Sequence, residues 1–545
     1  MGRKIPMWQA VLVMLFLVAV LMYCLGVLGK ATGIDALKCS YGEAHIPLII
    51  SAVLAGIVAV ANGYKWKYLE RGILSSINRS MQAILILLIV GILIGTWIAS
   101  GVIPAMIYYG LTVLKPSIFL LASCILCCIA ALATGSSWTT AGTIGIALIG
   151  IGQGLGISQA MTAGAIVSGA YFGDKMSPLS DTTNLAPAIA GASLFAHIRH
   201  MVYTVAPSIL IAMVLYGVLG LNITSRDALD AVPAIQNGLK ASFSINPALL
   251  IPPVMVIVVV ALKLPAIPSL LGGIIIAMIL GSIFQGVGIA DWPGIMHHGY
   301  VFEVNDAFNS TSDRLFAAHP EIGKTYGVST LADLEQADFA NVAKDFGLDL
   351  TTQTQYNLLQ LLSRGGMGSM LWTVNLILCA LCFGGIMDAS GMLGTVADGL
   401  LKIVHGTGSL VVIMVFSCIF VNFVAADQYL SIILPGRMYR EAFEDRRLKG
   451  KNLSRCLEDS GTITSSLIPW NTCGVTMQTF LGVKTWGGSG GGYGRWALFN
   501  LINPLVSILY GFTGITMEKM SDKEYSEILA EREKEKAEAL KALEA

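Results

Sequence analysis

The chain has 545 residues, of which 55% are hydrophobic and 12% are charged, whereas soluble domains carry roughly 25% charged residues. A soluble protein of this length would divide into several domains with polar surfaces, and too few polar side chains are present to cover them. The 34 basic and 34 acidic residues cancel, which argues against a nucleic-acid partner because nucleic acid requires a concentrated basic face.

Apolar segments recur along the whole chain at lengths close to a membrane span. They predict helices, because an open sheet in lipid would leave backbone groups unpaired. The first segment is too long for the roughly 7–15-residue core of a signal peptide, so we expect it to be a span. The segments are expected at about 6–29, 44–62, 83–104, 117–134, 139–156, 158–190, 200–220, 247–263, 268–288, 370–388, 408–426, 462–482 and 495–515.

Basic residues in short loops indicate which loops are cytoplasmic. By this rule the N-terminus, the segment from Lys65 to Arg79 and the segment from Gly436 to Arg455 are expected in the cytoplasm. The polar stretch 289–363 is rich in acids and poor in bases, and is expected outside. Both termini are cytoplasmic if the short apolar piece Tyr429 to Leu434 acts as a return leg. The tail after Met517 alternates Glu and Lys at helical spacing, which predicts a solvated helix.

The two halves of the chain contain the same parts in the same order: a span, a polar break, a return segment and an interrupted span. The breaks lie at 134–140 and 173–184 in the first half, and at 426–428 and 458–471 in the second. Loop charge gives the halves opposite directions, which is the pattern of inverted repeats in secondary transporters. The alternative is a chance alignment of two Ser/Thr-rich patches, but loop charge and break position agree independently.

Carboxylates inside membrane spans are functional candidates, because burying their charge is unfavourable. Candidates of this kind are Asp174, Asp181, Asp388, Asp427 and Asp459, with Glu458 beside the last. The eleven residues from Asp174 to Asn184 hold two carboxylates, two serines, two threonines and an asparagine. Such a density of oxygen suits a small hard cation such as Na⁺. One aspartate can hold either a proton or a sodium ion, and that competition suffices for antiport if only loaded carriers change sides.

Structural roles are the alternative for several of these residues. Asp174 and Lys175 could form an ion pair at an interface, and Asp388 could mark a helix end near the cytoplasm. Glu458 could cap the span that follows it. The density of oxygen around Asp174 favours a functional role there.

Four motifs in order resemble those of the NhaC-type sodium/proton antiporters, members of the larger ion-transporter superfamily. They are Ala133 to Trp138, Thr162 to Pro187, Ala426 to Met438 and Leu453 to Asn471. The resemblance covers nearly the whole membrane part, whereas the stretch 289–363 and the charged tail are less similar to the family. It implies an inverted-repeat fold with hairpins and broken helices in a transport domain beside a scaffold.

The sequence and the resemblance together predict an all-α polytopic membrane protein, an inverted-repeat secondary transporter with about 12–14 membrane segments. We expect a first repeat at 1–220 with a broken-helix motif at 173–184, then a linking loop and the first spans of the second repeat at 221–288. We further expect an acidic external insertion at 289–363, the rest of the second repeat at 364–515 with motifs 426–438 and 458–471, and a cytoplasmic helical tail at 516–545.

The predicted function is Na⁺/H⁺ antiport by alternating access, with both ions competing for buried carboxylates. The predicted ion-binding residues are Asp174, Ser177, Asp181, Thr182, Asn184, Asp427, Asp459, Thr462, Ser465 and Asn471, with Thr134, Ser136, Ser137 and Glu458 in a secondary role. We expect Na⁺ at Asp174, Asp181 and Asp459. No cofactor is expected, and Li⁺ is an alternative ion. Such transporters commonly form homodimers, but the sequence shows no dimerisation motif that would decide the oligomeric state. The expected location is the bacterial plasma (inner) membrane, with both termini cytoplasmic.

Three other functions compete with this prediction. The same family includes exchangers that couple Na⁺ and protons to small carboxylates such as malate and lactate. Lys175, Arg364 or Arg437 could hold such an anion. An intramembrane aspartyl protease is a weaker alternative, because paired Ser/Thr-rich breaks fit ion ligation rather than peptide cleavage. A passive channel would lack stoichiometric coupling.

Overall fold

The computed structural model describes residues 3–26, 39, 41, 43–222, 226–262, 264–334, 336–487, 491–530 and 532. Within these residues the chain is helical, and extended pairing is confined to two isolated bridges, Tyr300 with Arg364 and Leu448 with Lys519. The predicted all-α class is therefore confirmed. The predicted tail is described to residue 530 and at 532, and Lys534, Glu535 and Glu538 lie outside the described residues.

Seven helices in the described part are long and apolar enough to cross a membrane. They are α1 (Met7–Cys24), α4 (Trp66–Ala99), α6 (Pro116–Thr134), α11 (Leu194–Leu221), α14 (Ala266–Phe284), α20 (Met367–Ala389) and α22 (Thr407–Val424). Residues 232–242 and 247–260 pass the same test as a pair bent by 99°, which would make eight. The protein is thus a multi-pass membrane protein. The larger number of predicted segments is reached only by counting shorter and broken helices.

The shorter apolar helices are α3 (His45–Ala61), α5 (Val102–Val113), α21 (Met392–Leu401) and α27 (Leu498–Thr513). The bent pair consists of α12 (Arg226–Ser242), the 3₁₀ turn η3 (Pro247–Leu250) and α13 (Ile251–Ala261). Neither α12 nor α21 coincides with a predicted segment. The prediction relied on apolar runs of spanning length, and neither helix contains one. The helix α12 is interrupted by polar residues, and α21 has only 10 residues.

Broken helices occupy corresponding places in the two halves. In the first half α6 is followed by α7 (Ser137–Thr140), the π-helical turn η2 (Ala141–Gly145), α8 (Ile146–Gly154), α9 (Gln159–Met176) and α10 (Asp181–Ala190). In the second half α22 is followed by α23 (Gln428–Glu444), α24 (Gly450–Leu457), the π-helical turn η5 (Glu458–Thr462), α25 (Ile463–Ser465) and α26 (Thr472–Leu481). Each series then ends in one apolar helix, α11 or α27. Each series therefore places broken helices and one π-helical turn between two apolar helices, although the turn follows one helix in the first half and two in the second.

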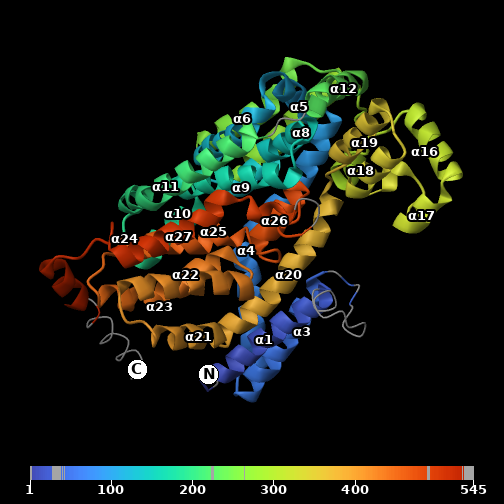
Figure 1. The fold of residues 1–545 in the computed structure, drawn as a ribbon. Helices are drawn as coiled ribbons and strands as arrows, with labels where there is room; N and C mark the ends of the chain where they lie inside the picture. The colour runs from blue at the N-terminus through green and yellow to red at the C-terminus, as the bar shows by residue number, and fades with distance from the viewer. Residues whose placement is uncertain are drawn as a thin grey trace.

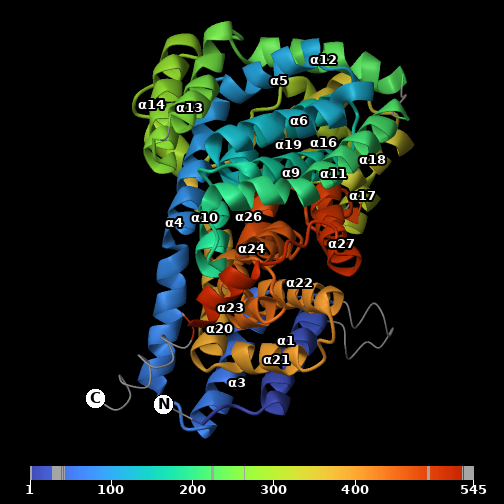
Figure 2. The same ribbon diagram turned by 90° about the vertical axis from the view of Figure 1, so that its left-hand side faces the viewer.

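The helices α4 and α20 lie side by side, and other helices pack on both sides of this pair (Figures 1 and 2). On one side of this pair, α1, α3 and α21 share an apolar core with α20. On the other side, α6 packs against α9 and α11, while α22 packs against α23 and α27. Figure 2 shows α4 running along one edge of the molecule, from α13 and α14 down to α3.

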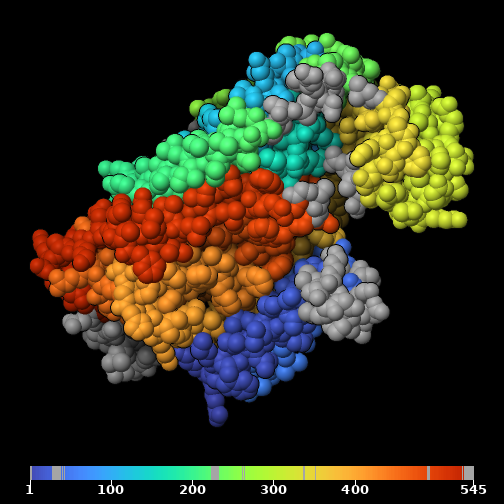
Figure 3. All heavy atoms as spheres, in the orientation of Figure 1, coloured from blue at the N-terminus to red at the C-terminus, as the bar shows by residue number. Residues whose placement is uncertain are grey.

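A separate group of helices lies between the halves of the chain. It comprises α16 (Asp306–Ala318), α17 (Pro320–Tyr326), the 3₁₀ turn η4 (Leu331–Asp333), α18 (Gln336–Asp345) and α19 (Leu350–Leu362). The helix that precedes it, α15 (Trp292–His298), packs against α4 and α20. Phe308, Leu331, Phe339 and Tyr356 are the centre of its own apolar core. Figure 3 shows this part, coloured yellow, projecting from the rest of the molecule.

Two segments expected to be cytoplasmic loops are largely helical. The helix α4 begins at Trp66 and carries the basic residues up to Arg79, because its inner face packs against α20. A Cβ at Gly72 would lie 2.4 Å from Cβ of Ala389, so glycine allows the two helices to approach. Arg79 pairs with Asp388 at 3.3 Å, close to the C-terminal end of α20, as expected for a helix-end residue.

The second of these segments, Gly436 to Arg455, is also helical at both ends. The return leg expected at Tyr429 to Leu434 belongs to the 17-residue helix α23, which continues through Pro435 to Glu444. The apolar pattern underestimated this helix because its second half is polar. Buried Tyr439 and Phe443 nevertheless anchor that half in an apolar core shared with α22 and α24.

Candidate functional site

The break after α6 is held open by glycine and a serine cap. Gly135 ends α6 in the left-handed conformation, with φ of 65°. The Oγ atom of Ser136 then accepts a hydrogen bond from the backbone N–H of Thr139 at 3.1 Å and caps α7. A Cβ at Gly135 would lie 2.7 Å from Cβ of Leu179. The first break therefore packs directly against the loop that separates α9 from α10.

Asp174 joins these two breaks. It lies in the last turn of α9, is buried, and its Oδ2 accepts hydrogen bonds from the backbone N–H of Ser137 at 3.0 Å and from its Oγ at 2.7 Å. Both hydrogen bonds come from the first residue of α7, so the carboxyl group of Asp174 fixes the start of that helix. After Pro178 the chain starts α10 at Asp181.

The second half contributes a third break. The helix α22 ends at Val424, Ala426 adopts a φ of 53°, and Asp427 caps α23 by accepting a hydrogen bond from the backbone N–H of Leu430 at 2.9 Å. The other carboxylate oxygen of Asp427 accepts from Oγ of Ser80 on α4 at 2.8 Å. Asp427 is thus fixed from two directions.

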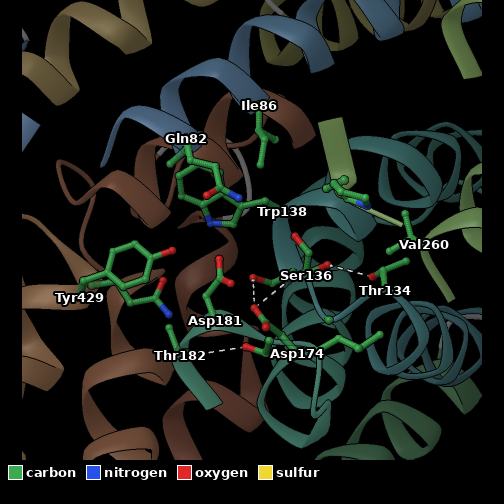
Figure 4. Close-up of a pocket in the computed structure, with 18 of the residues that line it drawn as sticks. Gln82, Ile86, Thr134, Ser136, Trp138, Asp174, Asp181, Thr182, Val260 and Tyr429 are labelled. Carbon is green, nitrogen blue, oxygen red and sulfur yellow. Dashed lines mark hydrogen bonds between the residues drawn. The ribbon is translucent and has the colours of Figure 1, made fainter. Parts of the chain in front are cut away.

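The three breaks enclose a cavity of about 310 Å³. Three carboxylates line it, those of Asp174, Asp181 and Asp427. In Figure 4 the Asp181 side chain reaches into the space between Trp138, Ser136 and Tyr429. The other polar lining residues are Ser80, Gln82, Thr134, Ser136, Ser137, Ser180, Thr182, Gln428, Tyr429 and Thr472. Among the described residues that line this cavity there is no lysine, arginine or histidine.

Seven of the predicted site residues line this cavity: Thr134, Ser136, Ser137, Asp174, Asp181, Thr182 and Asp427. Two others hold the nearby loop instead. Asn184 donates hydrogen bonds to the carbonyl oxygens of Pro178 at 2.9 Å and Ser180 at 2.7 Å, and Ser177 accepts one from the N–H of Leu179 at 3.3 Å. Their contacts with the chain organise the break rather than face the cavity.

The predicted residues of the last motif do not line the cavity. Asn471 caps α26 by accepting from the N–H of Cys473 at 3.0 Å, and donates to the carbonyl oxygen of Asn422 at 3.0 Å. Ser465 donates to the carbonyl oxygen of Thr462 at 2.7 Å within the same helical stretch. Glu458 and Thr462 are fully buried on η5.

Asp459 is separated from the other two aspartates at which Na⁺ was expected. Its Oδ1 is hydrogen-bonded by Nζ of Lys175, by Oγ1 of Thr204 at 2.9 Å and by Nδ2 of Asn503 at 2.7 Å. The guanidinium of Arg455 lies 3.8 Å from its other oxygen. The side chains of Lys175, Arg455 and Asp459 are all completely buried. Asp459 therefore stands in an ionic cluster and does not line the cavity.

Several cavity residues were not predicted from the sequence. Ser80 and Gln82 lie on the polar part of α4, where nothing in the local pattern distinguishes them from other polar residues before the apolar run. Trp138 and Tyr429 belong to the quoted motifs, but aromatic residues in a span are ordinarily packing residues. Lys175 was considered as a partner of Asp174, yet its ammonium group points to Asp459.

A family model described as the Na⁺/H⁺ antiporter family matches residues 169–314 and 321–515, well over half of the chain. The chain belongs to the Na⁺/H⁺ antiporter family. The match includes most of the stretch 289–363 and stops before the charged tail. The protein is therefore a membrane transporter and not an enzyme.

Relatives of this transporter cover most of its length. It is 34% identical over 511 residues to the Na⁺/H⁺ antiporter NhaC of Bacillus subtilis, covering 94% of this chain and 98% of the relative. It is 35% identical to a malate-2H⁺/Na⁺-lactate antiporter of Bacillus subtilis, with 86% and 89% covered. It is also 34% identical to the arginine/ornithine antiporter ArcD of Halobacterium salinarum, with 89% of both chains covered.

Proposed function

We propose that this transporter exchanges Na⁺ for H⁺ by alternating access, and that both ions compete for the carboxylates of the cavity. The observation that carries the proposal is the meeting of Asp174, Asp181 and Asp427 in one cavity without a basic side chain among its described lining residues. Hydroxyl groups of Ser136, Thr182 and their neighbours supply further oxygen ligands, which is the chemistry that a hard monovalent cation requires.

The three carboxylates differ in how strongly the protein holds them. Asp174 and Asp427 each accept hydrogen bonds from the chain on at least one oxygen. Asp181 reaches into the cavity, where an ion and water have direct access to it (Figure 4). We infer that Asp181 binds the arriving cation first and that Asp174 completes its coordination. Protonation of these groups removes the negative charge that attracts Na⁺, so each ion displaces the other.

The similar series of broken helices in the two halves support an inverted repeat, with the cavity where their breaks meet. In this arrangement the first repeat occupies 1–220 and the second begins within 221–288. Arg3 and Lys4 favour a cytoplasmic N-terminus in a bacterial plasma membrane, and an even number of membrane segments puts the C-terminus on the same side. By analogy with other transporters of this type, the proposal also includes a homodimer and transport of Li⁺.

Exchange of small carboxylates is less well supported by the cavity. Lys175 is buried and bound to Asp459, and Arg364 donates to the carbonyl oxygens of Gln360 at 3.2 Å and Leu481 at 3.5 Å. Arg437 is exposed on α23. None of the three basic residues considered for an anion lines the cavity. A malate or lactate ion would thus face three carboxylates and no compensating cation.

A small organic cation is the second candidate substrate. The cavity volume of about 310 Å³ is far larger than one sodium ion requires, and the indole of Trp138 and the phenol of Tyr429 stand beside the carboxylates. Aromatic faces and carboxylates together attract ammonium and guanidinium groups. The name of the arginine/ornithine antiporter relative makes these two amino acids the probes of choice.

The test uses purified protein in liposomes that contain a pH-sensitive dye. A Na⁺ gradient alone should drive proton movement in the wild type, and Asp181→Asn should abolish it because a neutral amide can neither release a proton nor attract the cation. The matched control is Asp388→Asn, since Asp388 pairs with Arg79 outside the cavity, and it should retain exchange.

Three outcomes would overturn the proposal. Wild-type exchange in Asp181→Asn would exclude this carboxylate as an ion ligand. Proton movement that requires malate or lactate would establish anion exchange, and movement that requires arginine or ornithine would establish the organic cation as substrate.

A further inference from the structure

The cavity is open at one end. Asp181 and Gln82 line it and are both exposed, and so is Leu264 in the loop between α13 and α14 that borders it. The part of α4 that lines the cavity, Ser80 to Ile86, comes directly after the basic residue Arg79. Ions in solution therefore reach the carboxylates from the end of α4 that carries Arg79.

Apolar packing closes the other end of the cavity. Val90, further along α4, and Phe480 of α26 are 0% and 1% exposed and belong to the same apolar core. A Cβ at Gly142 of η2 would lie 2.7 Å from Cγ1 of Val90 and 3.2 Å from Cε2 of Phe480, so the three elements are in direct contact. The helix α26 begins at Thr472, which lines the cavity, and therefore runs from the cavity to this closed end.

A hydrogen bond joins α26 to α20 at the closed end, where the two helices lie against each other (Figure 1). The hydroxyl groups of Thr373 on α20 and Thr479 on α26 are 2.7 Å apart. Thr479 donates its own proton to the carbonyl oxygen of Val475 at 2.8 Å, so Thr373 is the donor between the two hydroxyl groups. Because Thr373 is only 1% exposed, this contact is shielded from water.

Arg364, shortly before the start of α20, supplies a second contact with α26. Its guanidinium donates to the carbonyl oxygen of Leu481, the last residue of α26, at 3.5 Å, and to that of Gln360 on α19 at 3.2 Å. Gly482 ends α26 with φ of 68°, and a Cβ there would lie 2.7 Å from Nη1 of Arg364. The last carbonyl groups of a helix carry partial negative charge, which attracts a guanidinium. Arg364 is thus a positioning residue for the end of α26.

We propose that Thr373 and Arg364 form a gate with the last turn of α26, and that this gate keeps one end of the cavity closed while the other end is open. The gate lies on the side of the stretch 289–363, which Arg364 directly follows. Alternating access requires the closed end to open in another state, and α26 must then separate from α20 and break both contacts. The inference therefore rests on the proposed alternating access, but not on which ions are carried.

A disulfide across the gate tests whether it must open during transport. Thr373→Cys with Thr479→Cys places two thiols where the hydroxyl groups are 2.7 Å apart, close enough for a disulfide to form with an added mild oxidant. Oxidised proteoliposomes should lose exchange, and reduction should restore it. Each single variant should exchange in both conditions, which controls for oxidation of the native cysteines. Absence of the disulfide would contradict the contact, and exchange by protein shown by mass spectrometry to be cross-linked would refute the gate.

A labelling experiment tests the part played by Arg364. The reporter is Thr373→Cys in purified protein, because this thiol is buried while the gate is closed and reacts with a maleimide when the gate opens. Adding Arg364→Ala should raise the labelling rate at position 373 about fivefold, the effect of losing one hydrogen bond. Arg314→Ala is the matched control and should leave the rate unchanged, because Arg314 lies on α16 and donates to the carbonyl oxygen of Ser310 in its own helix at 3.0 Å. Equal rates in the two variants would remove Arg364 from the gate.

The outcomes separate this proposal from the proposed function. Labelling does not depend on the identity of the transported ions, so a wild type that moves no protons in response to Na⁺ would refute the proposed function while the labelling rates still test the gate. Normal exchange by the cross-linked protein would refute the gate alone. If Arg364→Ala does not fold, the disulfide experiment still decides, because it leaves Arg364 in place.

Discussion

Adjacent residues at the end of α9 serve different parts of the site. Asp174 turns toward Ser137 and the cavity, while the next side chain, Lys175, crosses to Asp459 in the other half of the chain. Sequence analysis identified all three charged residues as unusual, because charges in apolar segments stand out. It could not predict that Asp459 lies outside the cavity. The direction of each side chain depends on contacts between elements far apart in sequence, and Lys175 and Asp459 are separated by 284 residues.

The ion pair between Lys175 and Asp459 should dominate the stability of this region. Lys175→Met would leave the buried charge of Asp459 without its closest cation, and such a loss destabilises a protein by roughly 3–5 kcal/mol. The double variant Lys175→Met with Asp459→Asn removes both charges and should recover much of the stability. Thermal unfolding of the purified protein in detergent measures both. A single variant as stable as the wild type would contradict the buried pair.

Close packing between elements explains why the breaks stay in place. Pro178 and the run of small polar residues predicted an interruption after α9, and the structure has one between Met176 and Asp181. The π-helical turns η2 and η5 and the full length of α23 were not predictable, because the same residues could continue an α-helix or end it. Those choices are decided by the neighbouring helices, whose contacts a local pattern does not contain.

Glycines on α9 set its distance from α6. A Cβ at Gly169 would lie 2.2 Å from the carbonyl oxygen of Cys124, which forces the helices apart. Gly169→Ala should therefore destabilise the protein by about 1–3 kcal/mol, as other overpacking substitutions do. Gly217→Ala on α11 is the matched control, because no atom lies within 4 Å of its added Cβ, and it should be neutral or slightly stabilising. Equal melting temperatures for the two variants would mean that α9 and α6 are not in this close contact.

At the scale of the whole molecule, the end of the chain ties together parts of the second half. After α27, Glu518 pairs with Lys451 at 2.6 Å, and residues 522–530 form a helix whose Glu524 pairs with Lys449 at 3.0 Å. Further along, Arg532 pairs with Glu441 of α23 at 2.8 Å. The sequence predicted a solvated helix here but not these contacts, because exposed charges have many alternative partners. Each pair contributes little alone, so docking depends on several acting together.

The pH dependence of this docking follows from its carboxylates. The hydrogen bond from Lys451 lowers the pKa of Glu518 below its ordinary value of 4.5. The backbone N–H of Ser521, with help from Lys449, lowers the pKa of Glu524 to about 2. Because both pKa values are lower in the docked form, their contribution is complete above the ordinary value and is lost as the pH falls through the lowered values. Docking should therefore persist through neutral pH and fail only in strong acid, and high salt should weaken it.

Limited proteolysis of the segment that follows Glu518 tests this prediction. In the wild type, cleavage should be slow at neutral pH and should become faster in high salt or well below pH 4, roughly where glutamates are protonated. The double variant Lys449→Ala with Lys451→Ala should be cleaved quickly at neutral pH, because both pairs are lost. Lys523→Ala should behave as the wild type, since Lys523 contacts only Glu527 of its own helix, at 4.0 Å, among the ion pairs of the described residues. A cleavage rate that changes neither with salt nor with substitution of the two lysines would show that apolar contacts, not charge, hold the end of the chain in place.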